Sequence, residues 1–127
     1  MALEPFQYAV IRVVPRIERE EFVNVGVIVF CRTRGFLEAR VAFDHERVGL
    51  LSPGADLRGV REYLEAIVRV AAGDPTAGPI AVLPQSERFG WLAAPSSTVV
   101  QTSPIHTGLS ADPEATLARL FEQLVGA

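Results

Sequence analysis

The sequence predicts an α+β domain, with a mainly antiparallel sheet and two principal helices packed on one of its faces. Residues 6–14, 22–31 and 36–43 are rich in β-branched and aromatic residues and are joined by short polar connections. This pattern is typical of a three-strand antiparallel meander. Residues 57–71 and the segment after Asp112 have apolar residues at helical spacing. We expect one or two further strands between these helices.

The second predicted strand, "FVNVGVIVFC", is apolar on both faces, so we place it at the centre of the sheet. The third strand alternates between two faces. One face carries Leu37, Ala39 and Val41, and the other carries Phe36, Glu38, Arg40 and Ala42. The sequence leaves open whether both faces of the second strand are covered within one chain. An uncovered apolar face would favour a homodimer.

The helices have start and stop signals. Asp44 is placed to cap a short helix that runs to about Leu51, and Asp56 to open the helix over residues 57–71, which Gly73 ends. The last helix has Asp112 as its N-cap and Pro113 as its first residue. Its buried face is predicted to contain Leu117, Leu120, Phe121 and Leu124.

Three segments lie between these helices. Residues 80–83 predict a short edge strand, and residues 97–103 predict a strand that Pro104 ends. Residues 86–94 fit neither a helix nor a strand clearly.

Length and composition indicate a single domain over residues 1–127. The chain is 49% hydrophobic and 21% charged, as in ordinary globular proteins. Its net charge of −3 disfavours binding to nucleic acid by charge alone. Cys31 is the only cysteine, no basic leader is present, and Gln7 and Arg12 interrupt the N-terminal apolar run. We therefore expect a cytoplasmic protein without a membrane segment, metal or cofactor.

Polar residues interrupt two of the predicted strands. Asn24 and Gly26 lie on one face of the second strand, where an amide is costly to bury and a glycine weakens the strand. A β-bulge in which Asn24 caps a neighbouring backbone group explains both residues, and a bound ligand is the alternative. Arg12 lies within "YAVIRVV", and we expect it to pair with a carboxylate of a neighbouring strand. The candidates for this pairing are Glu20, Glu21 and Glu38.

A polar stretch, "SSTVVQTSPIHTG", covers residues 96–108. Its hydroxyl groups suit a phosphate or a carboxylate, with Arg88 supplying charge and Trp91 a stacking surface. They equally suit the ordinary hydrogen bonds of turns and strand edges.

His106 lies after Pro104, where we expect the chain to turn before the last helix. As a general base it would need a nucleophile, for which Ser97 and Ser103 are the candidates. As a metal ligand it lacks a partner, because His45, the only other histidine, lies far along the chain. As a hydrogen-bonding residue that ties the loop to the sheet, it needs nothing further.

Four segments together resemble the bacterial family known as domain of unknown function 3037: "YAVIRVVP", "REEFVNVGVIVF", "FGWLAAPSSTVVQTSPIHTGL" and "DPEATLARLFEQLV". The resemblance implies two motifs. The first contains Arg12, Arg19, Glu21, Asn24 and Gly26, and the second contains Pro95, Ser97, Thr98, Gln101, Pro104, His106 and Gly108. The family has no established activity, and its members are often encoded beside HipA-like kinases, which implies a partner or regulatory role. The shared polar residues imply that Glu21, Asn24 and His106 converge on one site.

The leading functional hypothesis is a non-catalytic binding or regulatory module that acts with a protein partner such as a HipA-like kinase. Its candidate binding residues are Arg12, Arg19, Glu21, Asn24, Ser97, Thr98, Gln101 and His106. The alternative is a small hydrolase or phosphoryl-transfer enzyme that uses His106 as general base or acid and Glu21 as its orienting group. This alternative predicts a cleft in which the two side chains lie within hydrogen-bond reach. A nucleic-acid accessory protein that uses arginines and Trp91 is a third hypothesis, which the acidic balance disfavours.

Overall fold

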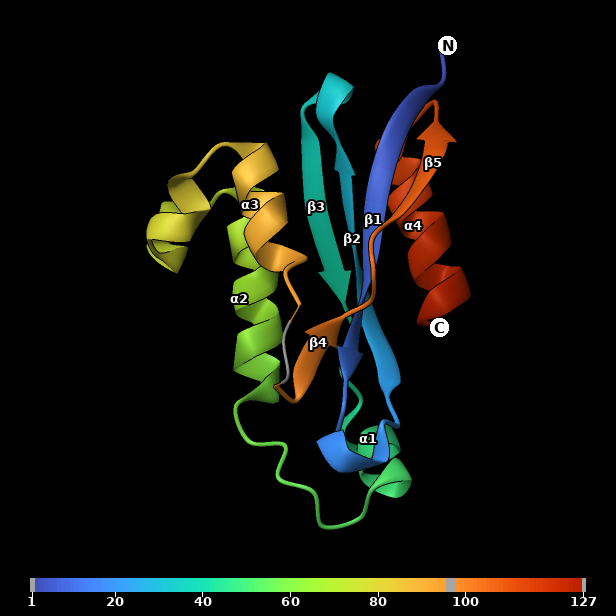
Figure 1. The fold of residues 1–127 in the computed structure, drawn as a ribbon, viewed down its shortest axis with the longest axis vertical. Coiled ribbons are helices and arrows are strands. Elements are labelled where there is room, and N and C mark those ends of the chain that lie inside the picture. The colour runs from blue at the N-terminus through green and yellow to red at the C-terminus, as the bar shows by residue number, and fades with distance from the viewer. Residues whose placement is uncertain (1, 96–97, 127) are drawn as a thin grey trace.

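The computed structural model describes residues 2–95 and 98–126, and it has helices on both faces of a five-stranded antiparallel sheet (Figure 1). The strands are β1 (Glu4–Val13), β2 (Val23–Cys31), β3 (Phe36–Val41), β4 (Val100–Thr102) and β5 (His106–Ser110). They are arranged in the order β3-β2-β1-β4, and β5 also pairs with β1. The α+β class and the three-strand meander are therefore confirmed.

β1 pairs along both of its edges. One edge pairs with β2, and the other pairs with β5 along the first half of β1 and with β4 at its end. Ser103 lies buried at the break between β4 and β5. Its Oγ accepts a hydrogen bond from the Val10 N–H (2.8 Å) and donates to the Pro104 carbonyl (2.9 Å). This side chain satisfies the Val10 amide where regular pairing between strands is interrupted.

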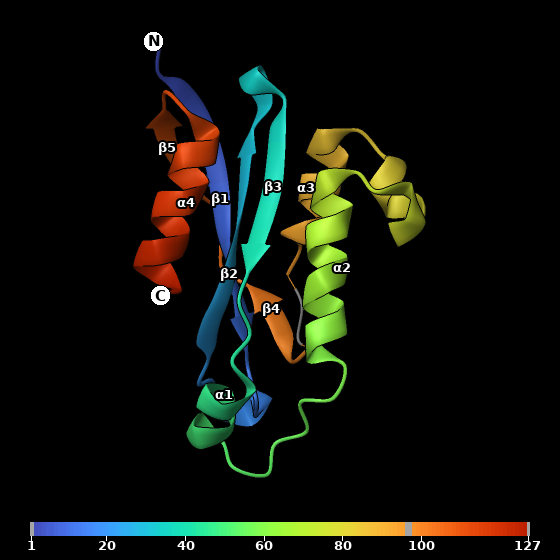
Figure 2. The same cartoon turned by 180° about the vertical axis from the view of Figure 1, so that it is seen from behind.

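The helices are α1 (His45–Leu51), α2 (Val60–Ala72), α3 (Gln85–Leu92) and α4 (Pro113–Leu124). Short 3-10 helices span Ile17–Arg19, Arg32–Arg34, Pro75–Ala77 and Pro79–Val82. α2 and α3 cover one face of the sheet, and α4 covers the other (Figures 1 and 2). This corrects the expectation that both principal helices share one face. The physical reason is that β2 is apolar on both faces, so each face requires a cover.

Each face of the sheet forms a core of its own. On the side of α2 and α3, Ile28 and Leu64 are almost fully buried. On the side of α4, Leu117 packs in a cluster with Val29. Cys31 is buried in this second cluster, as expected for a small core residue. Because one chain covers both faces of β2, neither face is left to form a dimer.

The predicted β-bulge is present in β2. Val25 is the extra residue, since Gly26 and Asn24 are opposite consecutive residues of β1. Asn24 donates from Nδ2 to the carbonyl of Leu124 at the end of α4 (3.1 Å). The expected cap of a backbone group is thus confirmed, and it satisfies a carbonyl that the helix end leaves free.

Gly26 is required by close packing within the sheet. A Cβ atom at this position would lie 2.7 Å from the carbonyl oxygen of Arg40 and 2.8 Å from Cγ1 of Val41 on β3, and 3.0 Å from Cδ1 of Ile11 on β1. Neighbouring strands therefore fill the space that a side chain would need, and no ligand is needed to explain the glycine.

The capping signals of the short helix and the last helix are confirmed. Asp44 accepts a hydrogen bond from the Arg47 amide (3.2 Å), and Asp112 accepts from the amides of the first turn of α4. Gly73 ends α2 in a left-handed conformation with a φ of 77°. These three caps lie where the sequence places them.

The start of the longer helix differs from the prediction, because α2 begins at Val60 rather than after Asp56. Asp56 instead accepts hydrogen bonds from the backbone and side chain of Arg58, and these bonds lower the pKa of Asp56 to about 2. Gly59, with a φ of 79°, is the N-cap. Its left-handed conformation excludes a continuous helix from residue 57 onward.

The segment between α2 and β4 also differs. Residues 80–83 do not form an edge strand, since Pro79–Val82 is a 3-10 helix. Proline suits the first position of such a turn because it has no N–H to satisfy. The ambiguous residues 86–94 contribute to α3, and β4 occupies only Val100–Thr102. Within residues 2–95 and 98–126, no helix combines the length and apolarity needed to cross a membrane.

We expect Gly26→Ala to lower the free energy of unfolding by about 1–3 kcal/mol, because the new methyl group must displace atoms of β3 and β1. Urea denaturation followed by circular dichroism measures this loss. Gly49→Ala is the control, since a Cβ atom there meets nothing within 4 Å. A Gly26→Ala variant as stable as the wild type would contradict the packing argument.

Candidate functional site

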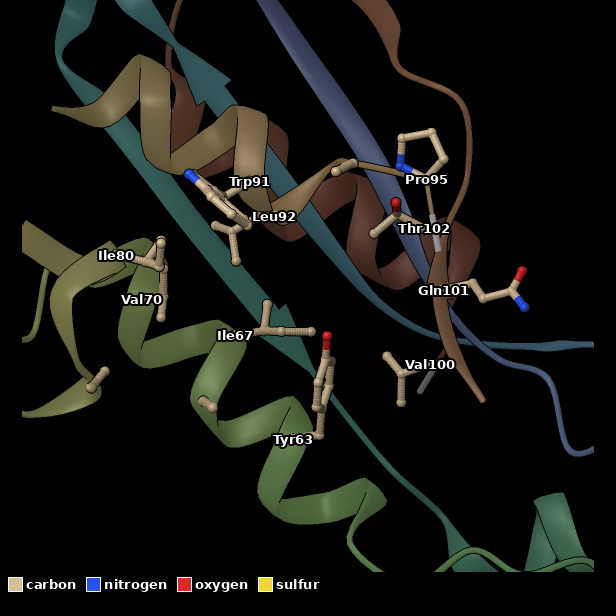
Figure 3. Close-up of a pocket in the computed structure, with 13 residues that line it drawn as sticks. Tyr63, Ile67, Val70, Ile80, Trp91, Leu92, Pro95, Val100, Gln101 and Thr102 are labelled. Atoms are coloured by element: carbon tan, nitrogen blue, oxygen red, sulfur yellow. The ribbon is translucent and has the colours of Figure 1, made fainter. Parts of the chain in front are cut away.

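A cleft of about 390 Å³ lies between α2, α3 and β4 (Figure 3). Most of its lining residues are apolar. The lining residues are Tyr63, Ala66, Ile67, Val70, Ala77, Ile80, Trp91, Leu92, Ala94, Pro95, Val100, Gln101 and Thr102. The volume lies within the range of about 300–1,000 Å³ that is usual for binding pockets.

Helical spacing and strand alternation bring this lining together. Tyr63, Ile67 and Val70 of α2 are four and three residues apart, so they lie along one face of the helix. On β4, Val100 and Thr102 point to the same face of the sheet, since they are two residues apart. The second polar motif thus forms one wall of the cleft through its apolar and hydroxyl side chains.

Two aromatic side chains of the cleft are exposed. Trp91 on α3 retains 62% of its surface, and Tyr63 on α2 retains 54%. In Figure 3 Trp91 projects from α3 and Tyr63 projects from α2. Large aromatic groups that border an apolar cleft offer a partner much area to bury.

Thr102 brings a hydroxyl group to the cleft wall. Its Oγ1 is buried and has no hydrogen-bond partner among the described residues. A buried hydroxyl without a partner costs about 1–3 kcal/mol, so its presence here needs an explanation.

The polar side chains of the cleft lining are those of Tyr63, Gln101 and Thr102. The described lining residues contain no carboxylate, histidine, cysteine or cationic group. Across residues 2–95 and 98–126, no three His, Cys, Asp or Glu side chains are grouped so that they could hold a metal ion.

A row of polar residues crosses the sheet beside β4. Arg12 of β1 is in register with Asn24 of β2 on one side and with Gln101 of β4 on the other. Residues in register point to the same face of a sheet. In Figure 3 the Gln101 side chain points away from the cleft. Three predicted binding residues therefore come together on the face opposite the cleft.

The expected ion pair between Arg12 and Glu20, Glu21 or Glu38 is not present. Its guanidinium carbon lies 4.1 Å from the centre of the Phe22 ring, which gives a cation–π contact. Its Nε is buried without a hydrogen-bond partner in the part of the chain that the structure describes. Glu21 instead forms an ion pair with Arg19, two residues earlier. Both groups of this pair are substantially exposed, so it adds little stability.

His106 lies apart from Glu21 and Asn24. It is an exposed residue of β5, not of a turn, and it is in register with Tyr8, whose ring centre lies 5.1 Å from its own. β2 begins opposite Val13, five residues along β1 from Tyr8, which corresponds to about 17 Å. The predicted convergence and the cleft shared by His106 and Glu21 are therefore not present.

The remaining candidates of the polar stretch make local hydrogen bonds. Thr98 donates from its hydroxyl to the Val100 carbonyl (2.7 Å), and Gln101 donates to the Thr98 carbonyl (2.8 Å). Ser97 lies outside the described residues. The other proposed nucleophile, Ser103, is engaged by backbone on both sides. These residues fit the interpretation of ordinary turn and strand-edge bonding.

The Arg88 guanidinium is bonded to backbone carbonyls. It donates to the carbonyls of Leu83 (2.7 Å) and Ala71 (3.4 Å), so it links α3 to the preceding turn and to the end of α2. Trp91, the other residue proposed beside it, does border the cleft.

Sequence reasoning did not identify Tyr63 or the α2 face as part of a site. The available signal was weak, because apolar residues at helical spacing are usually buried in the core. The cleft that Tyr63 lines is bordered by α3, which the sequence did not clearly predict.

Comparison with known proteins places the chain in a family without assigning an activity. Neither a curated protein nor a solved structure matched it. One family model matched residues 8–125, nearly the whole of the chain, in agreement with the resemblance of its two motifs. The chain therefore belongs to the family described as a protein of unknown function, DUF3037.

Proposed function

We propose that this protein is a non-catalytic binding module that takes an apolar side chain of a protein partner into the cleft between α2, α3 and β4. The observation that carries the proposal is the exposed Trp91 at the border of a mainly apolar cleft whose described lining has no carboxylate, histidine, cysteine or cationic group. Tryptophan is enriched among the residues that contribute most to protein interfaces, especially where a pocket lies beside it.

The polar row on the opposite face provides a second contact region. β4 is a short strand at the edge of the sheet, with Thr102 in the cleft wall and Gln101 in the row with Arg12 and Asn24. A partner that wraps around this edge reaches both faces. Arg19 and Glu21, which lie on the approach to β2, extend the region.

A HipA-like kinase is the first partner to test, because the family resemblance suggests this association. The kinase would bury Trp91 and contribute polar groups to Arg12 and Gln101. Such a contact would regulate the kinase without any reaction on this chain.

Trp91→Ala should weaken binding to a HipA-like kinase about thirtyfold, which corresponds to about 2 kcal/mol for a central interface tryptophan. Isothermal titration calorimetry with the two purified proteins measures the change. Leu109→Ala is the matched control, since Leu109 has a similar exposed fraction, 63%, but lies on β5 outside the cleft. Equal affinities of wild type and Trp91→Ala would exclude the cleft, and no binding by the wild type would exclude this kinase.

Thr102→Val should raise the free energy of unfolding by about 1 kcal/mol, because valine has nearly the same shape and removes a buried hydroxyl without a partner. Denaturant unfolding measures this gain. Thr116→Val should have the opposite sign, since the Thr116 hydroxyl is bonded to that of Ser110 (2.6 Å). A loss of stability in Thr102→Val would contradict the absence of a hydrogen-bond partner for this hydroxyl among the described residues.

A further inference from the structure

Trp91 borders a second hollow besides the cleft. This hollow is shallow, has a volume of about 470 Å³, and is lined by Glu87, Gly90, Trp91 and Ala94. All four residues are exposed. Trp91 and Ala94 also line the cleft of about 390 Å³, so the two hollows adjoin each other at these residues. A partner bound in the cleft therefore lies next to the second hollow.

Glu87 brings an unpaired negative charge to this hollow. Its carboxylate forms no ion pair with any residue that the structure describes. The neighbouring cation, Arg88, is engaged elsewhere, since its guanidinium donates to the carbonyls of Leu83 and Ala71. Glu87 and Trp91 are four residues apart on α3, so they lie on the same side of the helix with Cβ atoms about 5–6 Å apart. A free carboxylate therefore lies beside the exposed indole.

Gly90 is unexpected in the interior of α3, where glycine is less favourable than any other residue except proline. Close packing does not require it, since a Cβ atom there would meet no described atom within 4 Å beyond the local helix backbone. Its backbone conformation does not require glycine either, because its φ is not positive. Gly90 lines the hollow, and a side chain at this position would occupy part of that space. The glycine therefore keeps the hollow open at a cost in helix stability.

We infer that this hollow receives the guanidinium group of an arginine from the partner whose apolar side chain enters the cleft, and the inference rests on that proposed function. The guanidinium lies over the Trp91 indole and donates hydrogen bonds to the Glu87 carboxylate. One group can reach both, because a cation within about 6 Å of a ring centre is attracted to the ring and Glu87 lies about one helical turn away. The partner surface thus presents an apolar residue with an arginine beside it.

Charge and shape favour arginine over other occupants of the hollow. An apolar occupant would remove water from the Glu87 carboxylate without replacing its hydrogen bonds, which is costly. The planar guanidinium stacks on an indole and donates two parallel hydrogen bonds to a carboxylate, whereas the ammonium group of lysine is a strongly hydrated point charge. The net charge of −3 on the chain also favours a basic partner.

Selection from a library of random short peptides tests the inference without a known partner. The immobilised wild type should enrich peptides in which an arginine stands close to a large apolar residue. Glu87→Gln should enrich the apolar residue alone, because the amide no longer attracts a cation, and Trp91→Ala should lose both preferences. Glu122→Gln, which neutralises an exposed carboxylate on α4, is the matched control and should select the same peptides as the wild type.

Replacing arginine by citrulline in the tightest selected peptide removes the charge and keeps the shape. This change should weaken binding to the wild type about tenfold, as for a lost hydrogen bond between charged groups, and should leave binding to Glu87→Gln nearly unchanged. Trp91 is the only tryptophan of the chain, so its fluorescence reports the titration at the hollow itself.

Gly90→Gln separates binding from stability. Glutamine favours the helix, so the urea midpoint should rise, yet its side chain fills the hollow and should weaken binding of the arginine peptide about tenfold. Circular dichroism confirms that each variant is folded. Selected peptides without arginine, an equal effect of citrulline on wild type and Glu87→Gln, or unchanged binding by Gly90→Gln would each overturn the inference and leave the cleft proposal standing. A wild type that enriches no peptide would contradict both.

Discussion

The burial of β2 on both faces is the constraint on which the rest of the structure depends. Every residue from Val25 to Cys31 is buried, so two independent layers of apolar side chains must meet this one strand. α2 and α3 supply one layer and α4 supplies the other. The constraint places β2 away from the sheet edge, leaves β3 at the edge, and requires the chain to cross to the opposite face before its last helix.

The sequence predicts the parts of this fold that depend on local chemistry. The three long strands, the bulge at Asn24 and the caps at Asp44, Gly73 and Asp112 all follow from residue type and spacing. The placement of α4 does not, because the same amphipathic pattern suits either face of a sheet. The prediction that Asp56 caps the helix was wrong, because the Asp56 carboxylate instead accepts hydrogen bonds from Arg58. Such competition between partners depends on conformation as well as on spacing.

The sequence likewise predicts only part of the candidate site. Arg12, Asn24 and Gln101 are neighbours through strand register, whereas sequence reasoning placed Arg12 and Asn24 in one motif and Gln101 in the other. It failed for His106 because a turn was expected where β5 continues the sheet. The cleft was missed because it arises from three elements far apart in the chain, one of which was ambiguous. Polar residues attract notice in a sequence, whereas an exposed tryptophan is recognised only once the packing around it is known.

The pairing of β1 on both edges governs when the domain can complete its folding during synthesis. β1 leaves the ribosome before the other strands of this sheet, yet its Val10 amide is bonded by Ser103, 93 residues later. Until α4 is available, the apolar side of β2 around Val29 is uncovered. Contacts of such long sequence separation slow folding, and exposed apolar surface in the meantime favours aggregation or capture by chaperones. The last quarter of the chain therefore determines the time at which the nascent protein becomes native.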